Sequence, residues 1–113
     1  MKMEKITKQK TIEIFKENIG SDCYLLVASK KRIQKEFKTV QNFVEKGQEL
    51  IRKYGILKKD LELKIYTNFI ETNGSRLDLY NLNYNYIKEK NTLVLEEKQG
   101  DCYLIYLFEK KGE

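Results

Sequence analysis

Apolar residues recur along this chain with two different periods, and the change from one to the other predicts where helices and strands lie. Near the start, Ile12, Phe15 and Ile19 are three and four residues apart, which predicts a short helix over 7–20. Over 29–54 the steps of three and four recur, with one step of seven between Val44 and Ile51, at Ile33, Phe37, Val40, Val44, Ile51 and Tyr54. This pattern predicts one long amphipathic helix, because residues at this spacing share one helix face.

Three other segments have the patterns of strands. The run CYLLVAS (23–29) is apolar at nearly every position and has the length of a strand, so we expect a central strand with both faces covered. The segments 61–72 and 76–87 alternate between apolar and polar residues and flank Asn73-Gly74. Asn-Gly between two alternating runs is a strong hairpin signal.

A turn at Asn73-Gly74 predicts which residues face each other across this hairpin. On one face the expected pairs are Leu61 with Tyr86, Leu63 with Tyr84, Ile65 with Leu82 and Thr67 with Tyr80, and near the tip Glu71 faces Arg76. A last hairpin joins 92–97 to 102–108 and turns at Gln99-Gly100, although a turn at Gly100-Asp101 would shift its register.

Together these elements predict the α+β class, with residues 1–113 as one domain. The expected architecture is a mainly antiparallel sheet of five strands. The long amphipathic helix packs across this sheet, and the short N-terminal helix lies beside it.

The two cysteines, Cys23 and Cys102, each lie in a copy of the tetrapeptide DCYL. We interpret the copies as two similar strand starts, because the likeness ends after about five residues and the flanking elements differ. The two strands are expected to be antiparallel, which places the cysteines at opposite ends, roughly 15 to 20 Å apart. A disulfide needs alpha carbons about 4.4 to 6.8 Å apart, so we expect free thiols.

Composition argues against most catalytic chemistry. The chain has no His, Pro or Trp, and its six glycines are dispersed. Triads that need His, a structural zinc site and glycine-rich phosphate loops therefore have no basis, and no cofactor is expected. Abundant Lys, Glu, Ile, Asn and Tyr are typical of AT-rich coding, as in a low-GC microbe or its mobile genetic elements. No apolar segment is long enough for a membrane span, so we expect a cytoplasmic protein.

The net charge of +5 is concentrated in one segment. Residues 29–54 carry eight basic and three acidic side chains, whereas the rest of the chain is nearly balanced. Five cations gather at the start of this segment, namely Lys30, Lys31, Arg32, Lys35 and Lys38. Cations at a helix N-terminus oppose the helix dipole, and such local conflicts often mark function. We expect them to bind an anion or an acidic partner, with a solvated helix face as the alternative.

The predicted 61–87 hairpin offers a second candidate surface. Its polar face would carry a row of lysine, tyrosine and asparagine side chains, namely Lys64, Tyr66, Asn81, Asn83 and Asn85. Near the tip, Ile70, Leu77 and Leu79 fall on this polar face, so either another element packs on them or they form an exposed patch. An exposed patch would suit a partner or a homodimer. The alternative for the asparagine row is an ordinary solvent-facing strand.

Three hypotheses of function follow from these features. The first is a small non-catalytic inhibitor or regulator, encoded by a phage or plasmid, that binds an acidic protein or ribonucleoprotein through the basic helix and the exposed sheet. The second is a direct binder of nucleic acid or phosphorylated nucleotides, whose affinity would fall steeply with salt. The third, least favoured, is a His-free ribonuclease.

Overall fold

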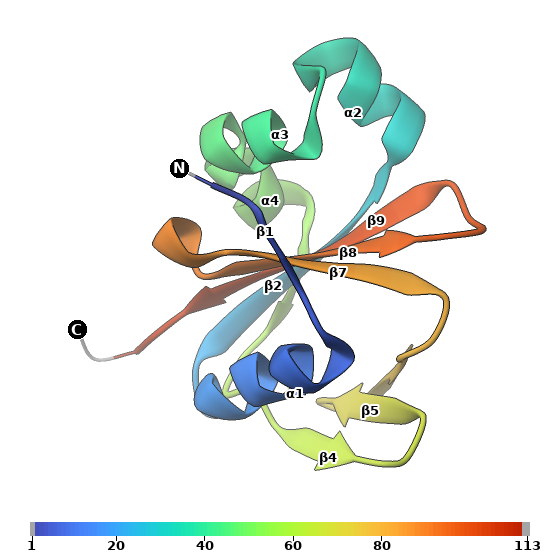
Figure 1. Cartoon of the computed structure of the whole chain (residues 1–113). Coiled ribbons are helices and arrows are strands. Elements are labelled where there is room, and N and C mark those ends of the chain that lie inside the picture. The colour runs from blue at the N-terminus through green and yellow to red at the C-terminus, as the bar shows by residue number, and fades with distance from the viewer. Residues whose placement is uncertain (1, 112–113) are drawn as a thin grey trace.

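The computed structural model describes residues 2–111 as two antiparallel sheets with four α-helices and one short 3-10 helix (Figure 1). In chain order the elements are β1 (Glu4–Ile6), α1 (Lys8–Glu17), β2 (Asp22–Ser29), α2 (Lys30–Phe37), α3 (Val40–Lys46), α4 (Gln48–Tyr54), β3 (Ile56–Lys58), β4 (Leu63–Ile65), β5 (Phe69–Thr72), β6 (Ser75–Asp78), β7 (Leu82–Ile87), η1 (Lys88–Lys90), β8 (Thr92–Glu97) and β9 (Cys102–Glu109).

The larger sheet has six strands in the order β1-β7-β8-β9-β2-β3, and the smaller has three in the order β4-β5-β6. Helices α2, α3 and α4 lie on one side of the larger sheet, and α1 and the smaller sheet lie on the other (Figure 1). The α+β class is confirmed. The single sheet of five strands is wrong, because part of the predicted long hairpin forms a separate sheet.

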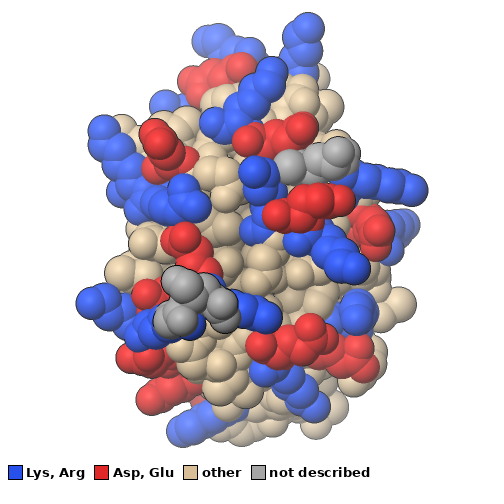
Figure 2. Space-filling model, turned by 90° about the vertical axis from the view of Figure 1, so that its left-hand side faces the viewer, with Lys and Arg blue, Asp and Glu red and all other residues tan. Residues whose placement is uncertain are grey.

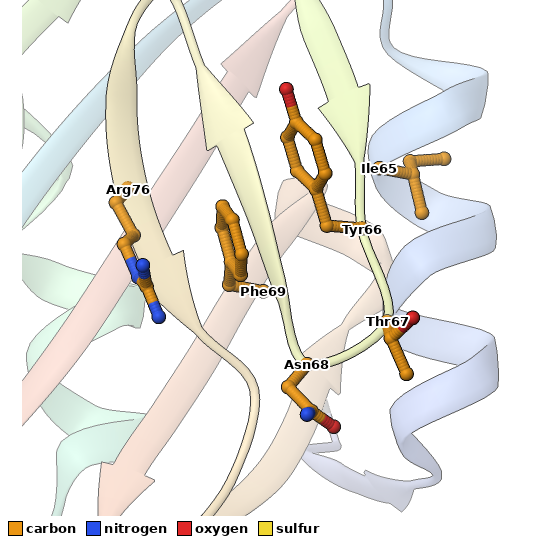
Figure 3. Close-up of a pocket in the computed structure, with 6 residues that line it drawn as sticks. All are labelled: Ile65, Tyr66, Thr67, Asn68, Phe69 and Arg76. Atoms are coloured by element: carbon orange, nitrogen blue, oxygen red, sulfur yellow. The ribbon is translucent and has the colours of Figure 1, made fainter.

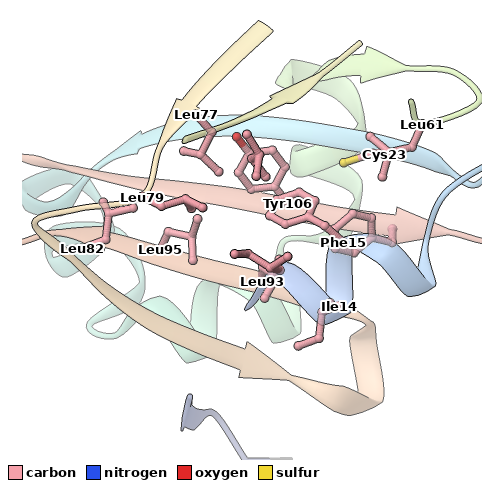
Figure 4. Packing of buried hydrophobic residues seen from close by; sticks show 13 residues of the cluster. Ile14, Phe15, Cys23, Leu61, Leu77, Leu79, Leu82, Leu93, Leu95 and Tyr106 are labelled. Carbon is pink, nitrogen blue, oxygen red and sulfur yellow. The ribbon is translucent and has the colours of Figure 1, made fainter. Parts of the chain in front are cut away.

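Each face of the larger sheet supports its own hydrophobic core, which explains the continuous apolar runs. On β8, Leu93 and Leu95 point toward α1 and the smaller sheet, whereas Val94 points toward α2–α4. In the first core the ring of Phe15 contacts Tyr106 edge to face, with centroids 5.1 Å apart (Figure 4). Side chains that alternate between two covered faces must all be apolar, so the strands lose the alternation of a half-exposed sheet.

The predicted long helix is three short helices. Lys38 interrupts it with φ 70° and ψ −51°, and the Thr39 N–H donates to the carbonyl of Phe37 at 2.8 Å, which together form a γ-turn. The Thr39 side chain then caps α3, and Gly47 separates α3 from α4. The three-and-four spacing persists because all three helices turn their apolar faces to the same sheet, so periodicity alone does not reveal the breaks.

The hairpin turn at Asn73-Gly74 is confirmed, but the predicted pairing extends only a few residues beyond it. Glu71 faces Arg76 as expected. The chain then turns again at residues 66–68, and β4 pairs with the other edge of β5. The expected pairs Leu61–Tyr86, Leu63–Tyr84, Ile65–Leu82 and Thr67–Tyr80 are therefore wrong.

The last hairpin and the cysteines follow the predictions. Glu96 faces Tyr103, the register expected from a turn at Gln99-Gly100. Strands β2 and β9 are antiparallel, with Ser29 opposite Cys102 and Cys23 six residues away along β2. Both thiols are free, and each DCYL copy lies at a strand start.

Candidate partner-binding groove

Two of the five predicted cations are held by the protein itself. The ammonium of Lys30 lies 3.4 Å from the Glu96 carboxylate and also donates to the carbonyl of Glu97. Its backbone N–H donates to the carbonyl of Asp101 at 2.8 Å. Lys30 therefore ties the start of α2 to the β8–β9 hairpin. Arg32 forms an ion pair with Glu36 at 3.3 Å on the same helix.

The other three cations, Lys31, Lys35 and Lys38, are exposed. Lys31 and Lys35 are one helical turn apart and lie opposite the buried Ile33, so they point straight into solvent. No ion pair to any of the three is found within residues 2–111. The predicted anion site at the helix N-terminus is also partly occupied, because the Arg32 N–H donates to the Ser29 hydroxyl at 3.4 Å.

The charges do not form a broad single-sign surface on the side of the molecule seen in Figure 2. There, Lys and Arg side chains alternate with Asp and Glu side chains over the whole visible face. The basic character of residues 29–54 therefore does not extend as a continuous patch over that side.

The residues predicted to form one polar row on the hairpin lie on two different sheets and the turns beside them. Lys64 and Tyr66 belong to the smaller sheet and its turn, whereas Asn83 and Asn85 lie on β7 of the larger sheet. Asn83 donates to the Glu96 carboxylate, and Asn85 donates to the carbonyl of Val94, both at 3.3 Å. Asn81 lies in a turn with φ 57°. These asparagines stabilise the sheet and its turns, and they do not form one surface with Lys64 and Tyr66.

The predicted apolar patch is part of the first core. Ile70, Leu77 and Leu79 are buried, because β5 and β6 turn this face toward the larger sheet (Figure 4). Of the two alternatives, packing by another element is therefore the one observed. Ile70, Leu77 and Leu79 therefore do not form the exposed apolar patch that suggested a homodimer.

The outer face of the smaller sheet carries a stack of planar side chains (Figure 3). The rings of Phe69 and Tyr66 lie nearly parallel with centroids 4.5 Å apart. On the other side of Phe69, the Arg76 guanidinium lies 3.8 Å from the centroid of the Phe69 ring (Figure 3). Arg76 also forms an ion pair with Asp78 at 2.6 Å. Each member already has a partner within the stack, so the arrangement stabilises this sheet by itself.

A groove lies between α2, α4 and the end of β2, with a volume of about 590 Å³. Arg32, Glu36 and Phe37 line it from α2, and Leu50 and Tyr54 line it from α4. The remaining lining residues come from the end of β2 and from the buried side chains beneath, namely Leu26, Val27, Ala28, Ser29, Ile33 and Phe43. The lining is mostly apolar, with one ion pair on the α2 wall.

The backbone of β2 is open along this groove. Strand β3 pairs only with 23–25 of β2, so in the described chain 26–29 have β9 on one side and no strand on the other. The carbonyl oxygen of Leu25 points toward Gly55, at the β3 side. Because N–H and C=O directions alternate along a strand, Val27 presents both groups to the same open side.

Exposed apolar side chains gather along the groove and on the adjoining edge strand. Val27 is 55% exposed, Tyr54 65% and Ile56 63%, and Leu50 and Leu57 are also exposed. Exposed apolar clusters of this kind mark interaction sites in many proteins. The signal for this surface in the sequence is the width of the apolar stripe of α4, because Leu50 and Tyr54 extend it and both remain exposed.

No three His, Cys, Asp or Glu side chains between residues 2 and 111 are placed to hold a metal ion. Burial raises the pKa of the Cys23 thiol to about 12, against a weaker lowering by Lys58, so this thiol is protonated at neutral pH. Over the same residues, no helix is long and apolar enough to cross a bilayer.

Comparisons with protein-family models, with curated proteins and with solved structures found no significant match.

Proposed function

We propose that this protein acts by binding another protein through the groove between α2, α4 and β2. The observation that carries the proposal is the combination, in one place, of an open strand edge, an apolar lining and exposed apolar side chains at Val27, Leu50 and Tyr54. Hydrophobic contacts supply most of the affinity of protein interfaces, and cations at the edge of such a site guide the partner. A role as inhibitor or regulator fits this mode of action.

The same surface suits a protein partner better than a nucleic acid. Nucleic acids are held mainly by cations that contact phosphates. Here Lys30 and Arg32 form ion pairs with glutamates, and within residues 2–111 no ion pair is found for Lys31, Lys35 and Lys38. The aromatic rings of Tyr66 and Phe69 lie on the other sheet and stack on each other.

The proposal is tested by recovering the partner and measuring its affinity for groove variants. Purified tagged protein is incubated with lysate of the organism that encodes it, and the recovered partner is produced separately. Its affinity is then measured by calorimetry for the wild type and for Val27→Asp. Val27 is 55% exposed, so the substitution should leave the fold intact while placing a charge at the open edge of β2 that borders the groove. We expect the affinity to fall at least about tenfold, which corresponds to about 1.4 kcal/mol.

The matched control is Ile19→Asp, because Ile19 is also 55% exposed but does not line the groove. It should bind the partner as the wild type does. Equal affinity of Val27→Asp and the wild type would contradict the proposal.

A parallel measurement addresses nucleic acid. Fluorescence anisotropy with labelled single- and double-stranded RNA and DNA is recorded at low and physiological salt, for the wild type and for the triple variant of Lys31, Lys35 and Lys38 to Ala. Binding that persists at physiological salt and is lost in the triple variant would favour the nucleic-acid hypothesis instead.

A further inference from the structure

We infer that the partner segment is an extended, acidic stretch of polypeptide that adds to β2 as a further strand. This inference rests on the proposed function, and it specifies the conformation and chemistry of what the groove receives. Addition of a strand to an exposed sheet edge is a recurring mode of peptide recognition, in which backbone hydrogen bonds give affinity and alternate side chains give specificity.

The backbone of β2 supports an extended occupant. Beyond Leu25 the strand has lost its β3 neighbour, and Val27 turns its N–H and C=O to the open side. Residues 26–29 span roughly 13 Å at about 3.3 Å per residue, which is enough to pair with four residues of an incoming strand. A helix in the groove would leave the Val27 groups without protein partners, whereas a strand would satisfy both.

The side chains along the groove suit a short segment that is apolar on both faces. Side chains of an added strand alternate between the two faces of the sheet. On one face they would meet Val27 and, diagonally, Ile56, since Ile56 is opposite Leu25 on the neighbouring strand. On the other face they would meet Leu26 and the helices above it, where Phe37 and Leu50 line the groove. Apolar side chains of the partner would therefore be buried on both faces of the short paired stretch.

The charge of the surrounding helices favours an acidic segment over a second copy of this chain. Residues 29–54 have a net charge of +5. Beside the groove, the Lys53 ammonium lies 5.3 Å from the ring centroid of Tyr54, which lines it, and within residues 2–111 no ion pair holds Lys53. Pairing of two copies through this edge would bring two such segments together, and like charges at an interface oppose association. Carboxylates flanking the paired residues of another protein would instead be attracted.

The test uses a library of random linear decapeptides displayed on phage and selected on the whole chain, with Val27→Asp protein used to remove peptides that bind elsewhere. We expect the selected peptides to carry net negative charge and to contain a short run of consecutive apolar residues, because both faces of the paired stretch are buried. Synthetic versions are then methylated at one backbone nitrogen at a time. Methylation should weaken binding about tenfold at alternate positions only, because a strand directs every second N–H toward its neighbour.

Each other outcome overturns the inference in a way that can be told apart from failure of the proposed function. Apolar residues spaced by three and four would indicate a helix in the groove, and neutral or basic peptides would contradict the charge argument. The absence of any peptide that distinguishes the wild type from Val27→Asp would show that the edge accepts no strand. A dimer in solution that Val27→Asp dissociates would identify a second copy as the occupant. The proposed function itself fails if the partner binds Val27→Asp with the same affinity as the wild type.

Discussion

At the scale of single residues, Lys38 has a backbone conformation that its residue type resists, and Cys23 is a fully buried thiol. Lys38 adopts the left-handed φ of 70° that glycine tolerates and lysine resists, between α2 and α3. Cys23 is a thiol held entirely within the first core. The turn at Lys38 is not visible in the periodicity of the chain, whereas the burial of Cys23 follows from its place in the continuous apolar run 23–29.

The turn at Lys38 leads to a prediction of increased stability. Lys38→Gly should raise the free energy of unfolding by about 1 kcal/mol, because backbone strain of about 1 to 3 kcal/mol is removed against a smaller entropic cost of glycine. Lys35→Gly, within α2, is the control and should lower it by about 1 kcal/mol. Urea unfolding followed by circular dichroism measures both. A loss of stability in Lys38→Gly would mean that the turn is not strained.

Burial of Cys23 predicts a loss of stability at alkaline pH. Its pKa is raised from 9.0 to about 12 in the folded protein, so the unfolded thiol ionises first as the pH rises. The stabilisation from the buried neutral thiol is complete below pH 9 and is lost progressively up to about pH 12. Between pH 8 and 10.5 this one group should lower the free energy of unfolding by about 2 kcal/mol.

Cys23→Ala should remove that contribution to the pH dependence, whatever its effect on stability at pH 8. The comparison of urea unfolding at the two pH values isolates the thiol, since buried Tyr106, whose pKa is also raised, remains in both proteins. Identical pH dependence in wild type and Cys23→Ala would contradict this account.

At the scale of elements, the sequence predicted local structure well and partners poorly. The turn at Asn73-Gly74 and the helix capped by Thr7 depend on neighbouring residues, and both are observed. The pairing of β4 with β5 depends on a second turn at residues 66–68 that has no Asn-Gly signal. Alternation assigns side chains to faces, but it does not say which strand lies beside which.

The smaller sheet is the part of the structure that differs most from the prediction, because one of its faces is buried against the larger sheet. If Ile70 is a core residue, Ile70→Ala should lower the free energy of unfolding by about 2 to 5 kcal/mol, from lost contacts and the cavity left behind. Ile65→Ala, opposite it on β4 and exposed, should cost less than about 1 kcal/mol. Urea unfolding measures both variants. A similarly small loss of unfolding free energy in both would mean that Ile70 is not a core residue.

At the scale of the whole molecule, both faces of the larger sheet are covered, and one corner of it remains open. The predicted basic residues lie beside that corner, but Lys30 serves the fold and only part of the group is free for a partner. The groove itself was not predicted, because it needs α2, α4 and the early end of β3 to be placed together. The sequences of α2, α4 and β3 do not predict a groove when each is taken alone, and the groove forms only where the three meet.

The most direct test of this account is amide hydrogen exchange at the end of β2, followed by NMR with and without the purified partner. In the free protein the Val27 amide should exchange much faster than those of Leu26 and Ala28, which face β9. In the complex it should become protected to a similar degree. A Val27 amide that is already protected in the free protein, or one that the partner leaves unchanged, would contradict the open edge and its role in binding.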